Sequence, residues 1–172
     1  IKNNPKAILP KGFNDSDIEI LNLRKKVSKI IEKECLKYGF IELDTSTIEY
    51  TESIGKFLPD VDRPSGVFSF QDDDEKWLSL RYDLTAPLAR YVAQNYQDLV
   101  KPFKRYQSGL VWRNEKPGPG RYREFFQFDA DVVGVDSTLI DAELCVMVCD
   151  ILIELGLNTS QFEIKFSNRE IW

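Results

Sequence analysis

RYQSGLVWRNEKPGPGRYREFFQFDAD, residues 105–131, is the stretch from which the fold can be predicted. Two segments in which side-chain character alternates flank a loop, KPGPG, at 116–120. Proline lacks an amide hydrogen and glycine weakens strand pairing, so neither strand can continue through this loop. A connection this short can join only antiparallel neighbours, because parallel strands need a long crossover. The sequence therefore predicts an antiparallel hairpin whose Pro/Gly-rich loop forms a mobile flap.

The alternation divides the side chains of this hairpin between two faces of a sheet. The apolar face is expected to be buried and carries Leu110, Trp112, Phe126 and Phe128. The opposite face carries Arg105, Gln107, Gly109, Val111, Arg113 and Glu115 from the first strand and Arg123, Phe125, Gln127, Asp129 and Asp131 from the second. Cations, an aromatic ring, an amide and acids together suit an anionic ligand that contains an aromatic ring. An ordinary hairpin with a solvated polar face explains the same residues equally well when they are taken alone.

Two segments resemble the signature motifs of a known enzyme class. The second motif of class II aminoacyl-tRNA synthetases has, at the end of its first strand, an aromatic residue, an arginine, any residue and a glutamate. Trp112-Arg113-Asn114-Glu115 resembles this pattern. The sequence of the whole hairpin resembles that of the histidyl-tRNA synthetase family, and this resemblance extends over nearly the whole chain. YGFIELDTSTIEY, at 38–50, is similar to the first motif, which forms much of the synthetase dimer interface, although Ser46 stands where that motif carries a proline.

Length and composition limit the functions that are possible. The 172 residues are enough for one globular domain with a core, and no apolar run is long enough to span a membrane. Three cysteines without metal-like spacing favour a reducing compartment, and we expect a cytoplasmic protein. The chain has no histidine, which excludes histidine-based catalysis within it. The net charge is −5, yet seven Lys/Arg against one acid between residues 101 and 123 suit phosphate chemistry at one site.

The rest of the chain alternates between helical and extended patterns. The sequence predicts helices at 17–38, from about 86, and at 139–155, strands at 40–43, 67–70, 77–81 and 161–167, and a further helix start at 168–170. Ser16 is expected to cap the first helix, and the acids at 71–75 to form a solvated hairpin tip. The predicted fold class is α/β of the α+β type, a mostly antiparallel sheet flanked by helices. This is the architecture of class II synthetase catalytic cores.

The resemblance implies a nucleotide site. In that family pattern Arg113 contacts the α-phosphate of ATP and is the catalytic residue, and Glu115 accepts from the adenine amino group. Phe125 stacks on adenine and Arg121 reaches the terminal phosphates. Mg²⁺ is expected to accompany ATP, and the sequence does not identify its ligands.

The resemblance also implies an amino-acid site. Asp83 pairs with the ammonium group of histidine, Thr85 adds a hydroxyl, and Gln127 contacts the polar end of the amino acid. Asp131 accepts from the imidazole, and Arg113 belongs to this set as well. Asp83 or Thr85 is also expected to cap the helix that begins near Ala86, and one residue can have both roles.

The implied activity is that of a histidine–tRNA ligase, which activates histidine with ATP to histidyl-adenylate and transfers it to tRNA(His). A homodimer is expected. The chain resembles the N-terminal portion of the catalytic domain, without the third class motif and the anticodon-binding domain, so we expect it to be inactive alone. Two alternatives stay open: a synthetase-like regulatory subunit of ATP phosphoribosyltransferase that binds histidine without charging tRNA, and a synthetase-like domain of a larger regulatory kinase.

Overall fold

The computed structural model describes residues 7–54 and 66–167. The chain forms two compact units, which are described one at a time. The first comprises residues 1–16, 43–99 and 107–129, and the second residues 17–42, 100–106 and 130–172, within the limits of the described parts. The helix start predicted at 168–170 and most of the loop predicted after residue 54 lie outside the described residues.

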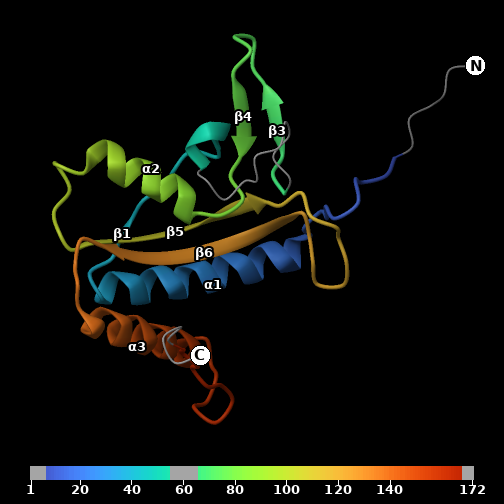
Figure 1. Ribbon diagram of the computed structural model, residues 1–172. Coiled ribbons are helices and arrows are strands. Elements are labelled where there is room, and N and C mark those ends of the chain that lie inside the picture. Colours follow the sequence, from blue (N-terminus) through green and yellow to red (C-terminus); the bar gives the residue numbers. More distant parts are fainter. Residues whose placement is uncertain (1–6, 55–65, 168–172) are drawn as a thin grey trace, which may run out of the picture. The chain divides into compact units, whose positions relative to one another are not determined.

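The predicted hairpin is confirmed as two long neighbouring strands, β5 (Phe103–Trp112) and β6 (Glu124–Val133). They run in opposite directions (Figure 1). The sheet is completed by β1 (Ile41–Glu42), which pairs with β5 in parallel, in the order β1-β5-β6. The sheet is therefore mixed, since the short β1 adds one parallel pair to an antiparallel one.

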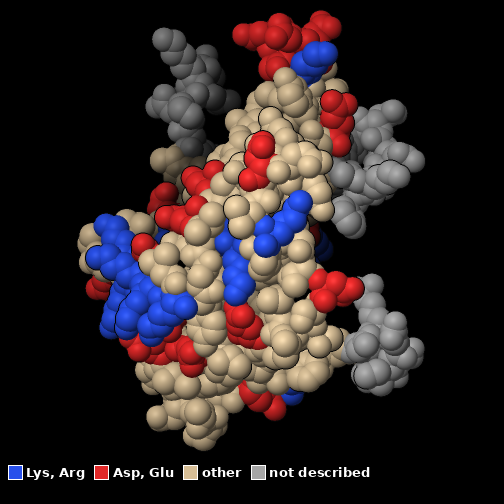
Figure 2. All heavy atoms as spheres, turned by 90° about the vertical axis from the view of Figure 1, so that its left-hand side faces the viewer, with Lys and Arg blue, Asp and Glu red and all other residues tan. Residues whose placement is uncertain are grey.

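The other sheet is antiparallel throughout and belongs to the first unit. Its order is β2 (Ile48–Tyr50), β4 (Trp77–Leu80) and β3 (Ser69–Gln71), and β2 was not predicted as a strand. The tip of the β3–β4 hairpin carries the acids at 72–75, which form the red group at the top of Figure 2. Asp72 shapes this turn, because its Oδ1 accepts from the backbone N–H groups of Asp74 and Lys76 at 3.0 and 2.8 Å.

The helices of the first unit are a short 3₁₀ turn, η1 (Thr51–Ile54), and α2 (Thr85–Asn95). The N-cap position of α2 is Leu84, which makes no side-chain cap bond. The predicted side-chain contact comes from Asp83, one residue earlier, whose Oδ1 accepts from the backbone N–H of Ala86 at 2.9 Å. Pro87 lies in the first turn of α2, where its missing N–H has no partner to lose. The bond from Asp83 ties the segment after β4 to the first turn of α2.

The second unit contains two helices packed against each other, α1 (Ile18–Lys37) and α3 (Thr138–Glu154). Tyr38 donates to Asp150 Oδ2 at 2.5 Å, and Lys33 forms an ion pair with Glu154. The N-cap of α1 is Asp17, whose side chain accepts from the N–H of Ile20, so the prediction of Ser16 as the cap is wrong by one residue.

In β5 the buried face is the opposite of the predicted one, whereas in β6 most side chains on both faces are half-buried. Phe126 is 38% exposed, and Leu110, Trp112 and Phe128 are half-buried, whereas Val111 and Gln107 are 0% and 1% exposed. The reason lies in Arg81, which follows β4. Its Nε donates to the carbonyl of Leu110 at 3.0 Å and its Nη1 to the carbonyl of Thr45 at 2.8 Å, so it covers the polar side of β5.

The strand predicted at 161–167 is also wrong, because these residues form no strand in the structure. Phe166, which the alternating pattern would place in a core, is 89% exposed. Among the described residues, no helix combines the length and the hydropathy needed to cross a membrane. The fold as a whole is α+β, as predicted, with helices, one mixed sheet and one antiparallel sheet.

Candidate functional site

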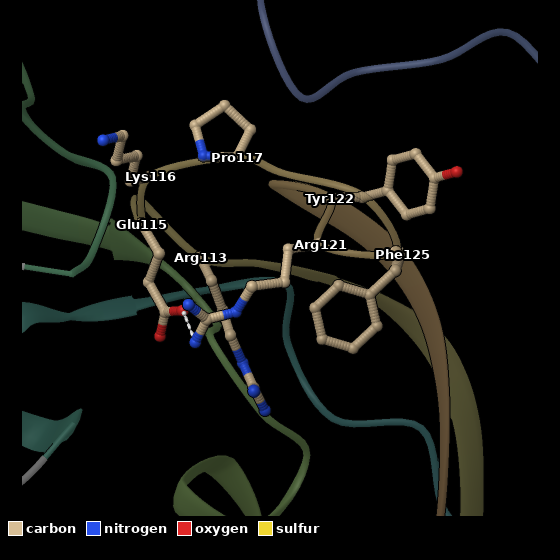
Figure 3. A pocket seen from close by; sticks show the side chains of 8 residues that line it. Arg113, Glu115, Lys116, Pro117, Arg121, Tyr122 and Phe125 are labelled. Atoms are coloured by element: carbon tan, nitrogen blue, oxygen red, sulfur yellow. Dashed lines mark hydrogen bonds and ion pairs between the residues drawn. The ribbon is translucent and has the colours of Figure 1, made fainter.

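A cavity of about 290 Å³ opens in the first unit where β5 leads into the Pro/Gly-rich loop. Its lining residues are Arg113, Glu115, Lys116, Pro117, Gly120, Arg121, Tyr122 and Phe125. Figure 3 shows their side chains. The four residues assigned to the nucleotide from the sequence therefore all lie in this one cavity. A floor with three cations, one acid and two aromatic rings suits a ligand with an anionic and an aromatic part.

The loop that forms the cavity is held by backbone hydrogen bonds. The N–H and C=O groups of Gly118 and Arg121 bond to each other at 2.9 and 3.2 Å, which closes a tight turn, and Gly120 has a φ of 70° there. The N–H of Asn114 donates to Gly66 O at 2.9 Å, and that of Arg123 to Gly12 O at 2.7 Å. These bonds give the loop a defined shape, and whether it moves as a flap stays a prediction.

Arg113 contacts one residue from each predicted ligand set, Phe125 and Gln127. Its Nε donates to the carbonyl of Tyr82 at 3.1 Å, and its Nη2 lies 3.5 Å from Gln127 Oε1. The guanidinium carbon lies 5.0 Å from the centre of the Phe125 ring, a cation–π contact. Burial, then the nearby Asp83 carboxylate, raises the pKa of the Tyr82 hydroxyl. The Tyr82 carbonyl and the Phe125 ring thus orient the Arg113 guanidinium. Among the described residues, no carboxylate lies within ion-pair distance of it.

Arg121 and Glu115 form an ion pair across the cavity mouth, as the dashed line in Figure 3 marks. Arg121 Nη2 and Glu115 Oε2 are 3.2 Å apart, and the two side chains are 72% and 49% exposed. Exposed pairs of this kind contribute roughly 0–1 kcal/mol, because water screens them. A ligand that offers a better partner to each side chain would therefore separate them at little cost.

Thr85 and Gln127, two members of the predicted amino-acid set, meet at a residue to which the sequence analysis gave no role. Thr85 Oγ1 donates to Asp129 Oδ2 at 3.3 Å, and Gln127 Nε2 donates to Asp129 Oδ1 at 2.9 Å. The signal was present in the sequence, since Asp129 shares the strand face of Gln127 two residues away. Asp83, a third member, uses Oδ1 as the helix cap described above.

Asp131, the remaining member, belongs to the second unit. Its Oδ2 lies 2.8 Å from Arg105 Nη2, and Arg105 is fully buried. This carboxylate therefore has a guanidinium partner within its own unit. Within the first unit, hydrogen bonds connect Thr85 and Gln127 to Asp129 and Arg113 to Gln127. Asp131 belongs to the second unit, and its place in the amino-acid set stays a prediction.

Comparison with known proteins agrees with the motifs. The family described as histidyl-tRNA synthetase matches residues 12–172. A histidine–tRNA ligase from Brucella ovis is 54% identical over 167 residues, which are 96% of this chain and 33% of that protein. The chain thus spans about a third of the length of the curated relatives it matches.

Solved structures share the fold. A histidyl-tRNA synthetase from Nostoc superposes with a TM-score of 0.75 at 28% identity, covering 89% of this chain and 35% of that one. A protein from Bacillus halodurans, described as an ATP phosphoribosyltransferase regulatory subunit/histidyl-tRNA synthetase, superposes with a TM-score of 0.76 at 26% identity, over 90% of this chain and 40% of that one. From the family match over residues 12–172 and the 54% identity, we conclude that this chain belongs to the histidyl-tRNA synthetase family.

Proposed function

We propose that this chain is the N-terminal part of the catalytic domain of a histidine–tRNA ligase. The protein would activate histidine with ATP to histidyl-adenylate and transfer the histidyl group to tRNA(His). One observation carries the proposal: Arg113, Glu115, Arg121 and Phe125, assigned to ATP from the motif alone, line a single cavity. The relatives named as histidine–tRNA ligases support it at 54% and 53% identity.

In the first step, a carboxylate oxygen of histidine attacks the α-phosphorus of ATP. A P–O bond forms to that oxygen, the P–O bond to the β-phosphate bridging oxygen breaks, and pyrophosphate leaves with the electron pair. No general base is needed, because a carboxylate is already ionised at neutral pH. The protein has to align the two groups and to stabilise charge on the phosphorus oxygens.

Arg113 is the residue suited to that stabilisation. Its Nε is bonded to the Tyr82 carbonyl, and its Nη2 has only the long contact to Gln127 at 3.5 Å. A guanidinium held on one edge and open on the other can donate to a phosphate oxygen without reorganising. By the family pattern, Phe125 stacks on adenine, Glu115 accepts from its amino group, and Arg121 binds the terminal phosphates.

Mg²⁺ is expected to enter with ATP, where it would neutralise phosphate charge. Mg²⁺ prefers oxygen ligands and keeps several waters, and Glu115 is the one carboxylate among the side chains that line the cavity. No group of three metal-ligating side chains occurs within residues 7–54 and 66–167. The residues present therefore fit an ion carried by the nucleotide better than an ion bound by the protein alone.

The amino-acid set is proposed to read histidine through polar contacts. Asp83 and Thr85 would bind the ammonium group, Gln127 the polar end and Asp131 the imidazole, with Arg113 shared between the two substrates. A site built from buried polar groups rejects wrong substrates by leaving those groups unpaired, a discrimination of roughly 10⁴ or more. We further propose that the full-length protein acts in the cytoplasm as a homodimer.

The second candidate function is that of a regulatory subunit of ATP phosphoribosyltransferase. The observation in its favour is the superposition on the Bacillus halodurans protein whose description names both activities. The complete nucleotide set weighs against it, because a protein that only senses histidine has no need of four ATP-directed side chains in one cavity. The predicted amino-acid set, Asp83, Thr85, Gln127 and Asp131, weighs less strongly against a regulatory kinase domain.

ATP–pyrophosphate exchange separates these readings. A full-length protein that contains this sequence should exchange labelled pyrophosphate into ATP only when histidine is added, and should then charge tRNA(His). Histidine and ATP binding without exchange would instead identify a regulatory protein.

A further inference from the structure

The exposed face of helix α1 carries a row of lysines. Side chains three and four residues apart are neighbours on a helix surface, and four of the lysines recur every four residues while a fifth lies beside them. The five residues of this lysine row are Lys25, Lys26, Lys29, Lys33 and Lys37. Between residues 25 and 37 the other exposed residues are Leu36 and a single acid, Glu32.

Two of the five lysines have acidic partners. Lys33 forms an ion pair with Glu154 of α3. Lys37 donates to both carboxylate oxygens of the buried Glu34, at 2.6 and 2.8 Å. In the parts of the chain that the structure describes, no acid lies within ion-pair distance of the other three, Lys25, Lys26 and Lys29.

The charge of the row is unfavourable for the helix alone. Like charges four residues apart on a helix repel each other, and a solvated face normally relieves this repulsion by placing acids between the lysines. The chain as a whole has a net charge of −5, so the row does not follow from a general excess of lysine. Positive charge gathered on one helix of an acidic chain creates a local field that attracts polyanions.

We propose that the lysine row binds the phosphate backbone of RNA. From the first to the last lysine the row extends over twelve residue steps, about 18 Å of helix, so it can follow several consecutive phosphates. Lysine suits this kind of contact, because its ammonium is a point charge on a flexible stem and binds phosphate without reading a base sequence. The row belongs to the second unit and the nucleotide cavity to the first.

RNA fits the row better than a membrane or a protein does. A helix that lies on a membrane inserts its apolar face into the lipid, whereas α1 already packs against α3. Protein interfaces are depleted in lysine. The choice of RNA over DNA rests on the proposed function, in which tRNA is a substrate. The inference goes beyond that function, because the row would bind RNA whether or not the RNA is charged with histidine.

The experiment measures the RNA affinity of the full-length protein by fluorescence anisotropy at several salt concentrations. The probes are labelled tRNA(His) and a labelled tRNA for another amino acid. The triple variant Lys25→Gln/Lys26→Gln/Lys29→Gln removes the three uncompensated charges and keeps good helix formers. We expect the Kd for both tRNAs to rise roughly 10- to 100-fold at about 0.1 M salt. The slope of log affinity against log salt should become shallower by roughly 2–3.

The matched control is Lys11→Gln/Lys76→Gln/Lys165→Gln, which removes the same charge from exposed lysines outside α1. It should change the slope by less than about one. The arginine triple at the three α1 positions keeps the charge, and it should retain the wild-type affinity and slope. If the glutamine triple does not fold, Lys29→Gln alone, in the middle of the row, should still reduce the slope by roughly 0.7–0.9.

A salt slope that is unchanged in the glutamine variants, or that falls equally in the control triple, would overturn the inference. A loss confined to tRNA(His) would overturn it as well, because backbone binding does not select a sequence. Loss of binding to phosphatidylserine vesicles with RNA binding intact would identify a membrane surface instead. Histidine-dependent pyrophosphate exchange needs no tRNA and should be equal in all folded variants, so its absence from the wild-type protein would overturn the proposed function and not the RNA surface.

Discussion

In the proposed function, the single side chain of Arg113 would serve two substrates. The Tyr82 carbonyl and the Phe125 ring hold its guanidinium in place, and one edge is left for a phosphate. Arginine is suited to this position because its planar fork donates in fixed directions. We expect a lysine at this position to keep the positive charge and to lose the fixed direction of hydrogen-bond donation.

Replacing Arg113 with alanine in the full-length enzyme should slow histidine-dependent pyrophosphate exchange by roughly 10²–10³, about 2.7–4 kcal/mol, because a preorganised donor to the transition state is lost. The KM for histidine should change far less. Lys76→Ala, at the exposed tip of the β3–β4 hairpin, is the matched control. Exchange close to the wild-type rate would contradict the charge-stabilising role of Arg113.

The three cysteines differ in their environments, which predicts their reactivity. Cys35 is fully buried, and burial, then the neighbouring Glu34 carboxylate, raises its thiol pKa to about 11. Cys145 and Cys149 are half-buried. Because the thiolate is the reactive form, we expect iodoacetamide at about pH 8 to label Cys145 and Cys149 well before Cys35. Peptide mapping by mass spectrometry measures the order, and early labelling of Cys35 would contradict its burial.

At the scale of elements, the hairpin depends on a glycine. A Cβ added at Gly109 would lie well inside van der Waals contact with the guanidinium of Arg81. That guanidinium is buried and bonded to the carbonyls of Leu110 and Thr45, so it cannot move aside freely. Gly109 thus lets β5 accept a side chain from the end of β4.

Gly109→Ala should lower the free energy of unfolding by about 1–3 kcal/mol, as overpacking does in tight interiors. Gly118→Ala is the control, because a Cβ at Gly118 has no neighbour within 4 Å. Urea unfolding of both variants measures the difference. Equal free energies of unfolding in the two variants would mean that Arg81 shifts without a loss of stability.

The hairpin could be predicted from sequence because its signals are local. Alternation gives the strands, and KPGPG gives the turn, and both depend only on neighbouring residues. Which face is covered depends on Arg81, which lies about thirty residues earlier in the chain, so the pattern within the hairpin could not reveal it. The failed strand at 161–167 shows the same limit, since alternation permits a strand but only a partner strand provides its hydrogen bonds.

The site was predicted to a similar extent. The family resemblance named four residues that line the cavity, because they lie on one strand pair and its loop, and their role in nucleotide binding stays a prediction. The contacts of Asp129 with Thr85 and Gln127 were not predicted, because Thr85 reaches Asp129 from another element. The pair of Asp131 with Arg105 was missed for a different reason, since a shared strand face does not reveal that an arginine neutralises a given acid.

For the whole molecule, two buried or bonded tyrosines predict how stability changes with pH. The hydrogen bond to Asp150, then burial, raises the pKa of Tyr38 to about 12, and burial, then Glu42, raises that of Tyr106 to about 12. Both folded-state values exceed the ordinary value of 10.0. Their stabilising contribution is therefore complete below about pH 10 and is lost as the pH rises towards about 12.

We accordingly expect the urea midpoint of the chain to fall between about pH 10 and pH 12. Tyr38→Phe should be less stable at neutral pH, because the bond to Asp150 is lost, and should show a shallower fall above pH 10. A midpoint that stays constant over this range in the wild-type chain would refute the linkage.

The ion pair between Glu115 and Arg121 has a consequence for the selectivity of the cavity that both residues line. A lone inorganic anion could compete for Arg121, but Glu115, whose side chain is 49% exposed, would then have only water as its donor. A molecule that brings both an exocyclic amine and a polyphosphate tail would satisfy both residues in one event. A ligand with only one of these two groups gains a contact with one residue, so the pair favours ligands that carry both.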